Sequence, residues 1–336
     1  MTDEIANFIP SLLASPSLLY NVIGLVIYAV VVAIIFSLFS YVMGWLERKI
    51  IAKAQYRHGP TYVGKWGIFQ NLADLVKLLS KEEIELDNAD RLLFMAGIPL
   101  LVAAAIFTIF LLPLSPTMQA TNLSFGILLV FVIIAFTPIL LFIAAFSSGN
   151  KFADISAQRS VLILFSYEIP MILVIAAIAL LAKGYNIQDI VGAQSPYYFA
   201  VLMPLGLVIM FIGMLAELER HPFDLREADS ELIAGWLTDV SAPYYALALF
   251  LDYARVFMGS VLMAILFFGG WLGPPMIPLP GLFWLILKAF LIGIFIIFIR
   301  ATAFRMRIDR VLRFGWSWLV PLSIINLIIT YIIFVR

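Results

Sequence analysis

The chain has 336 residues, of which 63% are hydrophobic and 12% are charged, whereas soluble domains carry about 25% charged residues. Its 21 basic residues balance 21 acidic ones, which excludes bulk electrostatic attraction to nucleic acid. The lack of cysteine excludes disulfides, thiolate-ligated iron–sulfur clusters and cysteine nucleophiles, and two histidines are too few for a histidine-ligated haem pair or a typical zinc site. We therefore predict a polytopic membrane protein without a metal site or a covalently bound cofactor.

The first apolar run is predicted to be retained as a membrane span. The chain opens with Asp3 and Glu4, and its first basic residue is Arg48. A cleaved signal peptide needs a basic start, so none is predicted. A span needs about 20 apolar residues. Eight runs meet this length, at about 20–46, 92–112, 124–146, 160–182, 197–216, 242–270, 281–300 and 314–335.

Between the first two runs, residues 67–82 read GIFQNLADLVKLLSKE. Apolar positions recur every three or four residues, whereas Asn71, Asp74, Lys77 and Lys81 fall largely off that stripe. This pattern predicts an amphipathic helix that lies at the membrane interface. The predicted fold is thus an all-α polytopic membrane protein. It has eight transmembrane helices plus amphipathic and short cytoplasmic helices, in a single integral membrane domain covering residues 1–336.

The basic residues predict the orientation. The loops after spans one, three, five and seven, at about 47–91, 147–159, 217–241 and 301–313, hold 17 of the 21 basic residues when Arg300 is counted with the last loop. Basic loops stay in the cytoplasm, so we expect a multi-pass protein of the cell membrane with both termini outside. The sequence shows no inverted pair of span lengths, which argues against a generic transporter.

The densest charge follows the fifth run. Residues 216–236 read AELERHPFDLREADSELIAGW, and seven of the 21 acidic residues lie within 217–239. Pro222 ends any continuing helix. Asp224 stands three residues before Glu227, which is the spacing of a helix N-cap and its reciprocal partner. These signals predict a short helix over about 225–236.

On that helix, Glu227 and Glu231 would lie one turn apart. Carboxylates this close resist simultaneous ionisation, which raises some of their pKa values towards neutral and suits them to passing protons. The alternative is a solvated loop whose acids balance Arg220 and Arg226.

Four ionisable residues fall inside the apolar runs. Glu168 lies in span four with Pro170 just beyond it, Asp252 lies in span six three residues before Arg255, and Lys288 lies in span seven. An ionised group in lipid is costly unless it is paired or faces a wet cavity. Asp252 and Arg255 fit a simple ion pair along one helix face, whereas Glu168 has no local partner and indicates function.

The first and last of the charged loops are basic. The first reads WLERKIIAKAQYRHGPTYVGKWG, and anchoring to anionic lipid is a sufficient explanation for its charge. The last reads IRATAFRMRIDRVLRFGW and is also suited to docking an acidic face of a soluble partner.

Seven motifs occur together in a family-specific order. They are ERK at 47–49, RHGP at 57–60, GNK at 149–151, SYE at 166–168, PFDLREADSEL at 222–232, FGGW at 268–271 and RMRID at 305–309. In these motifs the chain resembles the H-subunit family of respiratory complex I, from about Glu47 to the C-terminus.

The resemblance implies a membrane subunit whose cytoplasmic loops bind an iron–sulfur subunit and a hydrogenase-like large subunit. Other membrane subunits, including antiporter-like ones, and lipids would surround its spans. Iron–sulfur clusters and flavin would belong to the partner subunits only. The headgroup of a lipid-soluble carrier would enter a chamber between this subunit and those partners, and charged residues would continue from the chamber into the membrane to couple carrier reduction to proton pumping.

The resemblance also assigns roles to positions, although it implies no catalytic residue and no activity for the chain alone. The implied carrier-chamber residues are Arg48, Lys49, Arg57, Asp224, Glu227 and Arg300. The implied proton path comprises Glu47, Glu168, Glu227, Asp229, Glu231, Asp239 and Asp252. The implied partner-docking residues are Arg305, Arg307 and Asp309.

Some positions depart from the family pattern. Tyr56 and Thr61 stand where the family commonly has asparagine, and Asp229 replaces the usual glutamate. These changes leave the carrier open between quinone and methanophenazine, and the electron donor open between NADH, deazaflavin and ferredoxin. Two other functions also stay open. They are the corresponding subunit of a membrane-bound hydrogenase, and a free-standing ion or substrate transporter that uses the same buried charges.

Overall fold

The computed structural model describes residues 16–84, 86, 89–226, 229–274 and 279–335, and all regular structure in these residues is helical. Seven helical runs are long and apolar enough to cross a membrane. They are α2 (Pro16–Ala54), α4 (Arg91–Leu111), α5 (Gly126–Phe146), α6 (Lys151–Ala182), α11 (Ala242–Phe267), α12 (Gly281–Thr302), and a last run made of α13 (Ile308–Phe314), a π-helical turn (Gly315–Leu319) and α14 (Val320–Thr330). The predicted all-α polytopic membrane protein is confirmed, although the described residues contain seven helical runs of spanning length and not the eight predicted.

The fifth predicted span is a broken helix rather than a continuous one. α8 (Phe199–Leu202) ends at Met203, and α9 (Pro204–Glu217) begins at the next residue. Pro204 has no backbone N–H and disfavours helical geometry in the residue before it, and Met203 has φ −137° and ψ 67°. The 14 residues of α9 extend about 21 Å at 1.5 Å per residue, which is less than a bilayer core of about 30 Å.

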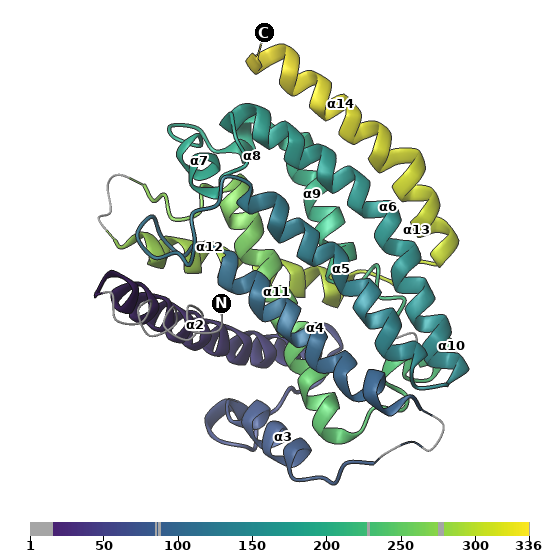
Figure 1. Ribbon diagram of the computed structural model, residues 1–336. Coiled ribbons are helices and arrows are strands. Elements are labelled where there is room, and N and C mark those ends of the chain that lie inside the picture. The colour runs from purple at the N-terminus through teal and green to yellow at the C-terminus, as the bar shows by residue number, and fades with distance from the viewer. Residues whose placement is uncertain (1–15, 85, 87–88, 227–228, 275–278, 336) are drawn as a thin grey trace, which may run out of the picture.

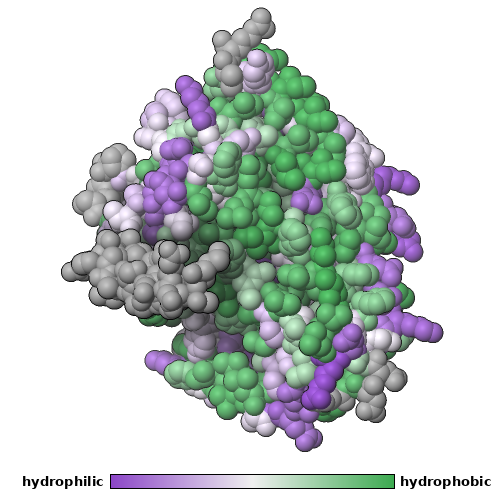
Figure 2. Space-filling view, in the orientation of Figure 1, coloured by the Kyte–Doolittle hydropathy of each residue, from purple (hydrophilic) through white to green (hydrophobic). Residues whose placement is uncertain are grey.

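Helix α11 forms the centre of the bundle, between α2, α4 and α12, and its second half is almost entirely buried (Figure 1). Helices α4, α5 and α6 pack in succession, and α6 also packs against α9 and α14. Figure 2 shows that hydrophobic side chains dominate the visible face, with hydrophilic ones towards its lower end and edges. This distribution suits a bundle whose flanks face lipid and whose loops face water.

The predicted interface helix is α3 (Gln70–Leu79), and its polar side is the side that faces the protein. Asn71 donates a hydrogen bond to the backbone oxygen of Tyr41 over 3.1 Å, and Asp74 accepts one from Arg48 over 2.6 Å. The apolar side chains of Leu72 and Val76 are exposed. α3 therefore turns its apolar face away from the bundle, as a helix at a lipid surface would.

Lys288, one of the four ionisable residues inside the predicted spans, has backbone partners in the structure. Its Nζ donates to the backbone oxygens of Phe268, Gly270 and Leu272 over 2.6, 2.9 and 2.5 Å. Gly269 and Gly270, with φ of 69° and 47°, make the turn that presents these oxygens. The lysine on α12 thus satisfies three carbonyl groups of the turn that follows α11.

The loops after spans one, three, five and seven meet at one end of the bundle, which we call the charged end. The amide of Asp90 donates to the oxygen of Ser147 over 2.9 Å, and the amide of Met306 donates to the oxygen of Pro222 over 3.0 Å. These bonds join loops that are distant in sequence. The predicted grouping of the basic loops on one side is thus seen in the fold.

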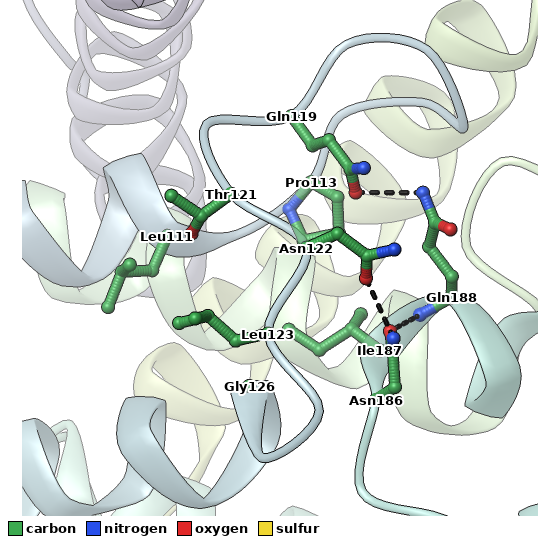
Figure 3. Close-up of a pocket in the computed structure, with 10 residues that line it drawn as sticks. All are labelled: Leu111, Pro113, Gln119, Thr121, Asn122, Leu123, Gly126, Asn186, Ile187 and Gln188. Carbon is green, nitrogen blue, oxygen red and sulfur yellow. Dashed lines mark hydrogen bonds between the residues drawn. The ribbon is translucent and has the colours of Figure 1, made fainter.

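At the opposite end, amide side chains tie two loops together. Gln188 donates to Gln119 over 2.8 Å, and Asn186 donates to Asn122 over 2.7 Å (Figure 3). The pocket drawn there has a volume of about 10 Å³, which is room for about one water molecule. These residues therefore fasten the loops and leave no space for a larger ligand.

The helix predicted over 225–236 is shorter than expected. Within the described residues of this loop, helix is confined to α10 (Asp229–Leu232) and to a 3₁₀ turn, Gly235–Leu237. Ile233 and Gly235 have φ of 62° and 58°, which breaks the helix between the two segments. Glu227, the predicted partner of the Asp224 N-cap, lies outside the described residues.

Candidate functional site

A cavity of about 380 Å³ opens at the charged end, between the end of α2, the 57–60 loop, the start of α11 and the end of α12. Its charged lining residues are Glu47, Arg48, Arg57, Arg220, Asp252 and Arg300. Five of these six were predicted as chamber or path residues, and Arg220 was not. Lys49 lies just behind the lining, where its Nζ donates to the oxygen of Pro60 over 2.6 Å.

Glu47 is the buried carboxylate of this cavity. Its side chain is 5% exposed and accepts a hydrogen bond from Arg220 Nη1 over 2.9 Å, and it also forms an ion pair with Arg300. The three residues come from α2, from the loop after α9 and from α12. Two guanidinium groups on one carboxylate leave this wall with a net positive charge.

A second ion pair lies at the rim of the cavity. Arg48 contacts Asp74 of α3 over 2.6 Å. Burial by itself would raise the pKa of Asp74, but the hydrogen bonds from Arg48 and Gln70 and the positive charges of Arg48 and Lys77 outweigh burial and lower that pKa. Asp74 therefore stays ionised and holds α3 against α2.

Behind the cavity wall, a buried group of alternating charges joins three segments. We call Glu219, Arg226, Asp252, Arg255 and the ring of Trp236 the Arg226 cluster. Arg226 forms ion pairs with Glu219 and, over 3.2 Å, with Asp252, while Arg255 contacts Glu219 over 2.9 Å. The guanidinium of Arg226 also lies 4.9 Å from the centre of the Trp236 ring.

The interpretation of Asp252 and Arg255 as a pair along one helix face is wrong. Although they lie three residues apart on α11, Arg255 contacts Glu219 and Asp252 contacts Arg226. The loop after α9 folds back onto α11 and brings closer partners than the helix itself provides. Asp252 therefore faces both the cavity and the buried cluster.

The acidic loop is also joined to the last charged loop. Asp224 lies 3.4 Å from His221 Nδ1 and 3.4 Å from Arg305 Nη2. Burial is the main cause that lowers the pKa of His221; Asp224 opposes this shift, and Arg305 and Arg220 add to it. This arrangement places two predicted residues, Asp224 and Arg305, together at one junction.

Deeper in the bundle, Glu168 of α6 lies within electrostatic range of Glu217, the last residue of α9. A cavity of about 10 Å³ next to them is lined by Tyr167, Glu217 and Glu219 among others. It has room for about one water molecule. Glu219 thus belongs both to the Arg226 cluster and to the surroundings of this inner pair of acids.

The other predicted residues lie at the surface of the charged end or outside the described parts. Glu231 contacts Arg159 over 2.6 Å, with its side chain 58% exposed. Asp239 is half-buried before α11, and Arg307 and Asp309 are exposed at the start of α13. Glu227 lies outside the described residues, as does the side chain of Asp229.

Several residues that organise the site were not among the predicted chamber, path or docking residues. They are Asp74, Glu217, Glu219, Arg220, Arg226 and Arg255. A signal for two of them was present, because Arg220 and Arg226 are the only bases in the densest run of acids. Among the described residues, no three acidic or histidine side chains converge as metal ligands.

The fold and the site define a class: a polytopic helical membrane protein with an ion-paired cavity where its charged loops meet. A family model described as "NADH dehydrogenase" matches residues 26–331. The chain therefore belongs to the H-subunit family of NADH dehydrogenase.

Relatives named for two different electron donors are similar over nearly the whole chain. The H subunit of NADH-quinone oxidoreductase from Dehalococcoides mccartyi is 38% identical over 311 residues, covering 92% of this chain and 86% of the relative. The H subunit of F(420)H(2) dehydrogenase from Methanosarcina acetivorans is 34% identical, and the alignment covers 92% of this chain and 91% of the relative. The H subunit of NADH-quinone oxidoreductase from Brevibacillus brevis is 35% identical, and the alignment covers 96% of this chain and 92% of the relative.

Proposed function

We propose that this chain is the membrane subunit of a redox-driven ion pump resembling complex I, and that its cavity at the charged end receives the headgroup of a lipophilic electron carrier. The cavity carries this proposal. Its volume of about 380 Å³ falls within the range of small-molecule sites, and its charged groups are placed where a headgroup needs hydrogen bonds.

The charge of the cavity suits a carrier that becomes negative when it is reduced. Four guanidinium groups line it against the carboxylates of Glu47 and Asp252. Positive charge near a reducible headgroup stabilises the anion that forms before protons arrive. Arg48, Arg57 and Arg300 are the residues that we assign to this task, with Lys49 shaping the loop behind them.

The acids that continue inward are proposed to couple carrier reduction to ion movement. Asp252 lies in the cavity wall, Glu219 lies behind it, and Glu217 with Glu168 lies deeper in the bundle. Ionisable groups that persist inside a membrane protein mark ion and proton pathways. Asp229, Glu231 and Asp239 belong to the mouth of the same path in this proposal.

The charged end is proposed to face the cytoplasm and to bind an iron–sulfur subunit and a hydrogenase-like large subunit. A chain without cysteine has no thiolates to ligate an iron–sulfur cluster, so electrons would reach the carrier through partner subunits. Arg307 and Asp309 are exposed beside Arg305 and are available for docking. Relatives named for NADH–quinone and for F(420)H(2) chemistry are almost equally similar, so either donor, with quinone or methanophenazine as carrier, fits this chain.

The test uses the assembled complex in native membranes with Arg300→Gln. We expect donor-driven reduction of the lipophilic carrier to fall about tenfold or more, since removing one charged partner from a buried site costs about 2 kcal/mol or more. Donor oxidation by a soluble artificial acceptor should persist, because that reaction bypasses the cavity. Lys151→Gln, which removes an exposed charge at the start of α6, is the matched control.

Two outcomes would overturn the proposal. One is unchanged carrier reduction in Arg300→Gln complexes. The other is ion transport by the isolated chain in liposomes, which would indicate a free-standing transporter. Purification of the chain with hydrogenase activity and without any extractable carrier would assign it to a membrane-bound hydrogenase instead.

A further inference from the structure

We propose that Arg226 is a positioning residue that transmits charge between the cavity and the inner acids by moving its guanidinium between Asp252 and Glu219. The inference rests on the proposed function, which supplies the charge change in the cavity. It concerns a residue without a place in the carrier chamber, because Arg226 does not line the cavity. Arg226 acts on the cavity through Asp252, which does line it.

The geometry places one guanidinium against two carboxylates. Arg226 Nη2 lies 3.2 Å from Asp252 Oδ1, while its Nη1 forms an ion pair with Glu219 Oε2. The side chains of Arg226 and Glu219 are 4% and 8% exposed, whereas that of Asp252 is 22% exposed. The cluster is therefore wet at its cavity side and dry at its inner side.

The backbone of Arg226 is fixed while its side chain spans the two acids. Ser156 of α6 donates its hydroxyl to the carbonyl oxygen of Arg226 over 2.8 Å. Gly235 lies directly against the same carbonyl, where a Cβ would come within 2.1 Å of the oxygen. The guanidinium, which lies over the Trp236 ring, is the part of the residue that contacts both acids.

A proton cannot hop through Arg226 itself. Arginine stays protonated in proteins, so a carboxylate on one side of it cannot send a proton through it to the other. A negative charge arriving in the cavity, or a proton bound by Asp252, changes the pull on Arg226 instead. The guanidinium then moves closer to one of the two acids, Asp252 or Glu219, and away from the other. Glu219 lines the cavity of about 10 Å³ together with Glu217, so the change reaches that second acid.

Arg255 is the second counter-charge of Glu219 at the inner side of the cluster. It contacts Glu219 over 2.9 Å, and its charge also acts on Glu217. When Arg226 moves away from Glu219, Arg255 remains as the counter-charge of that acid. The inner acids are thus affected by the cavity through a movement of charge, without a continuous chain of proton carriers.

The experiment compares ions moved per electron pair with the rate of carrier reduction, in the assembled complex reconstituted in proteoliposomes. In Arg226→Gln we expect most of the ion movement to be lost while carrier reduction continues. In Arg226→Lys we expect partial rescue, because lysine keeps the charge but lacks the fork that reaches two carboxylates. Lys151→Gln, an exposed neutralisation at the same end, should keep the wild-type ratio.

A double variant distinguishes transmission of the charge change by Arg226 from a role of Arg226 in stabilising the fold only. Arg226→Gln with Asp252→Asn should pump no worse than Arg226→Gln alone, because both remove the same link. A normal ratio of ions to electrons in Arg226→Gln would overturn the inference, as would losses that add in the double variant. If carrier reduction by the complex is absent in the wild type as well, the proposed function fails rather than this inference.

Discussion

Glu47 and Arg220, which stand 173 positions apart in the chain, form a buried ion pair with 2.9 Å between Oε1 and Nη1. Their side chains are 5% and 9% exposed. Arg300 contacts the same carboxylate from α12. One acidic side chain thus fastens the end of α2, the acidic loop and α12, and the cavity wall depends on it.

Replacing this carboxylate should damage the fold as well as the cavity. We expect Glu47→Gln to lower the free energy of unfolding by about 3–5 kcal/mol, because breaking a buried ion pair leaves its partner uncompensated. Glutamine keeps the size of the side chain and removes only the charge. Thermal unfolding of the purified chain in detergent measures the effect.

Asp74→Asn is the matched control for that prediction. It breaks the ion pair with Arg48. The side chain of Arg48 is 39% exposed and that of Asp74 is 25% exposed. Pairs with this exposure contribute about 1 kcal/mol or less. Similar melting temperatures for Glu47→Gln and Asp74→Asn would show that the ion pairs of Glu47 stabilise the fold no more than the Arg48–Asp74 pair does.

Lys288 provides a prediction for the opposite end of α11. In Lys288→Met, three carbonyl oxygens lose their common donor. We expect a loss of about 2–4 kcal/mol in the free energy of unfolding, since each buried acceptor left unsatisfied costs about 1–3 kcal/mol before the turn relaxes. Lys151→Met, at an exposed lysine, should melt like the wild type. An unchanged melting temperature in Lys288→Met would mean that water replaces the ammonium group.

The sequence was sufficient for seven of the eight predicted spans because each of these depends on local composition. A run of about 20 apolar residues forms a helix in lipid whatever surrounds it, since its backbone groups have no other partners. The break at Met203 was also encoded locally, in Pro204, but the apolar run on both sides concealed it. The interface helix followed from its periodicity in the same way.

The pairing of charges could not be predicted in that way. Asp252 and Arg255 have a suitable spacing on one helix, yet each finds its partner on the loop after α9. Which partner wins depends on how the loop folds back, and that is set by contacts such as Ser156 with Arg226, 70 residues apart. Sequence spacing carries no information about such distant contacts.

Gly235 is where this folded-back loop is most sensitive to substitution. Its φ is 58°, and a Cβ there would lie 2.1 Å from the carbonyl oxygen of Arg226. We expect Gly235→Ala to cost about 1–3 kcal/mol through strain and to displace the Arg226 carbonyl from Ser156. Thermal unfolding measures the cost, and protease sensitivity of the 217–241 loop measures the displacement.

The matched control is Gly24→Ala. Gly24 is exposed on α2, and no heavy atom lies within 4 Å of the Cβ that alanine would add. Alanine in a helix is about 1 kcal/mol better than glycine, so this variant should be neutral or slightly more stable. Equal behaviour of the two variants would mean that the loop adapts to a side chain at Gly235.

His221 predicts a dependence of stability on pH. Burial lowers its pKa in the folded protein below the ordinary value of about 6.5. Between these two pKa values the unfolded chain binds more protons than the folded one, so stability rises with pH in that window. The contribution of His221 is therefore complete above about pH 6.5 and is lost as the pH falls through the lowered pKa.

The measurement is the melting temperature of the wild type and of His221→Gln at a series of pH values from neutral to mildly acidic. Glutamine does not titrate, so the wild type should lose stability relative to the variant as the pH falls, and the two curves should run parallel at higher pH. His58→Gln, at an exposed histidine, should follow the wild type. If the wild type instead gains stability relative to His221→Gln on acidification, then the attraction of Asp224, 3.4 Å away, outweighs burial and raises the pKa of His221.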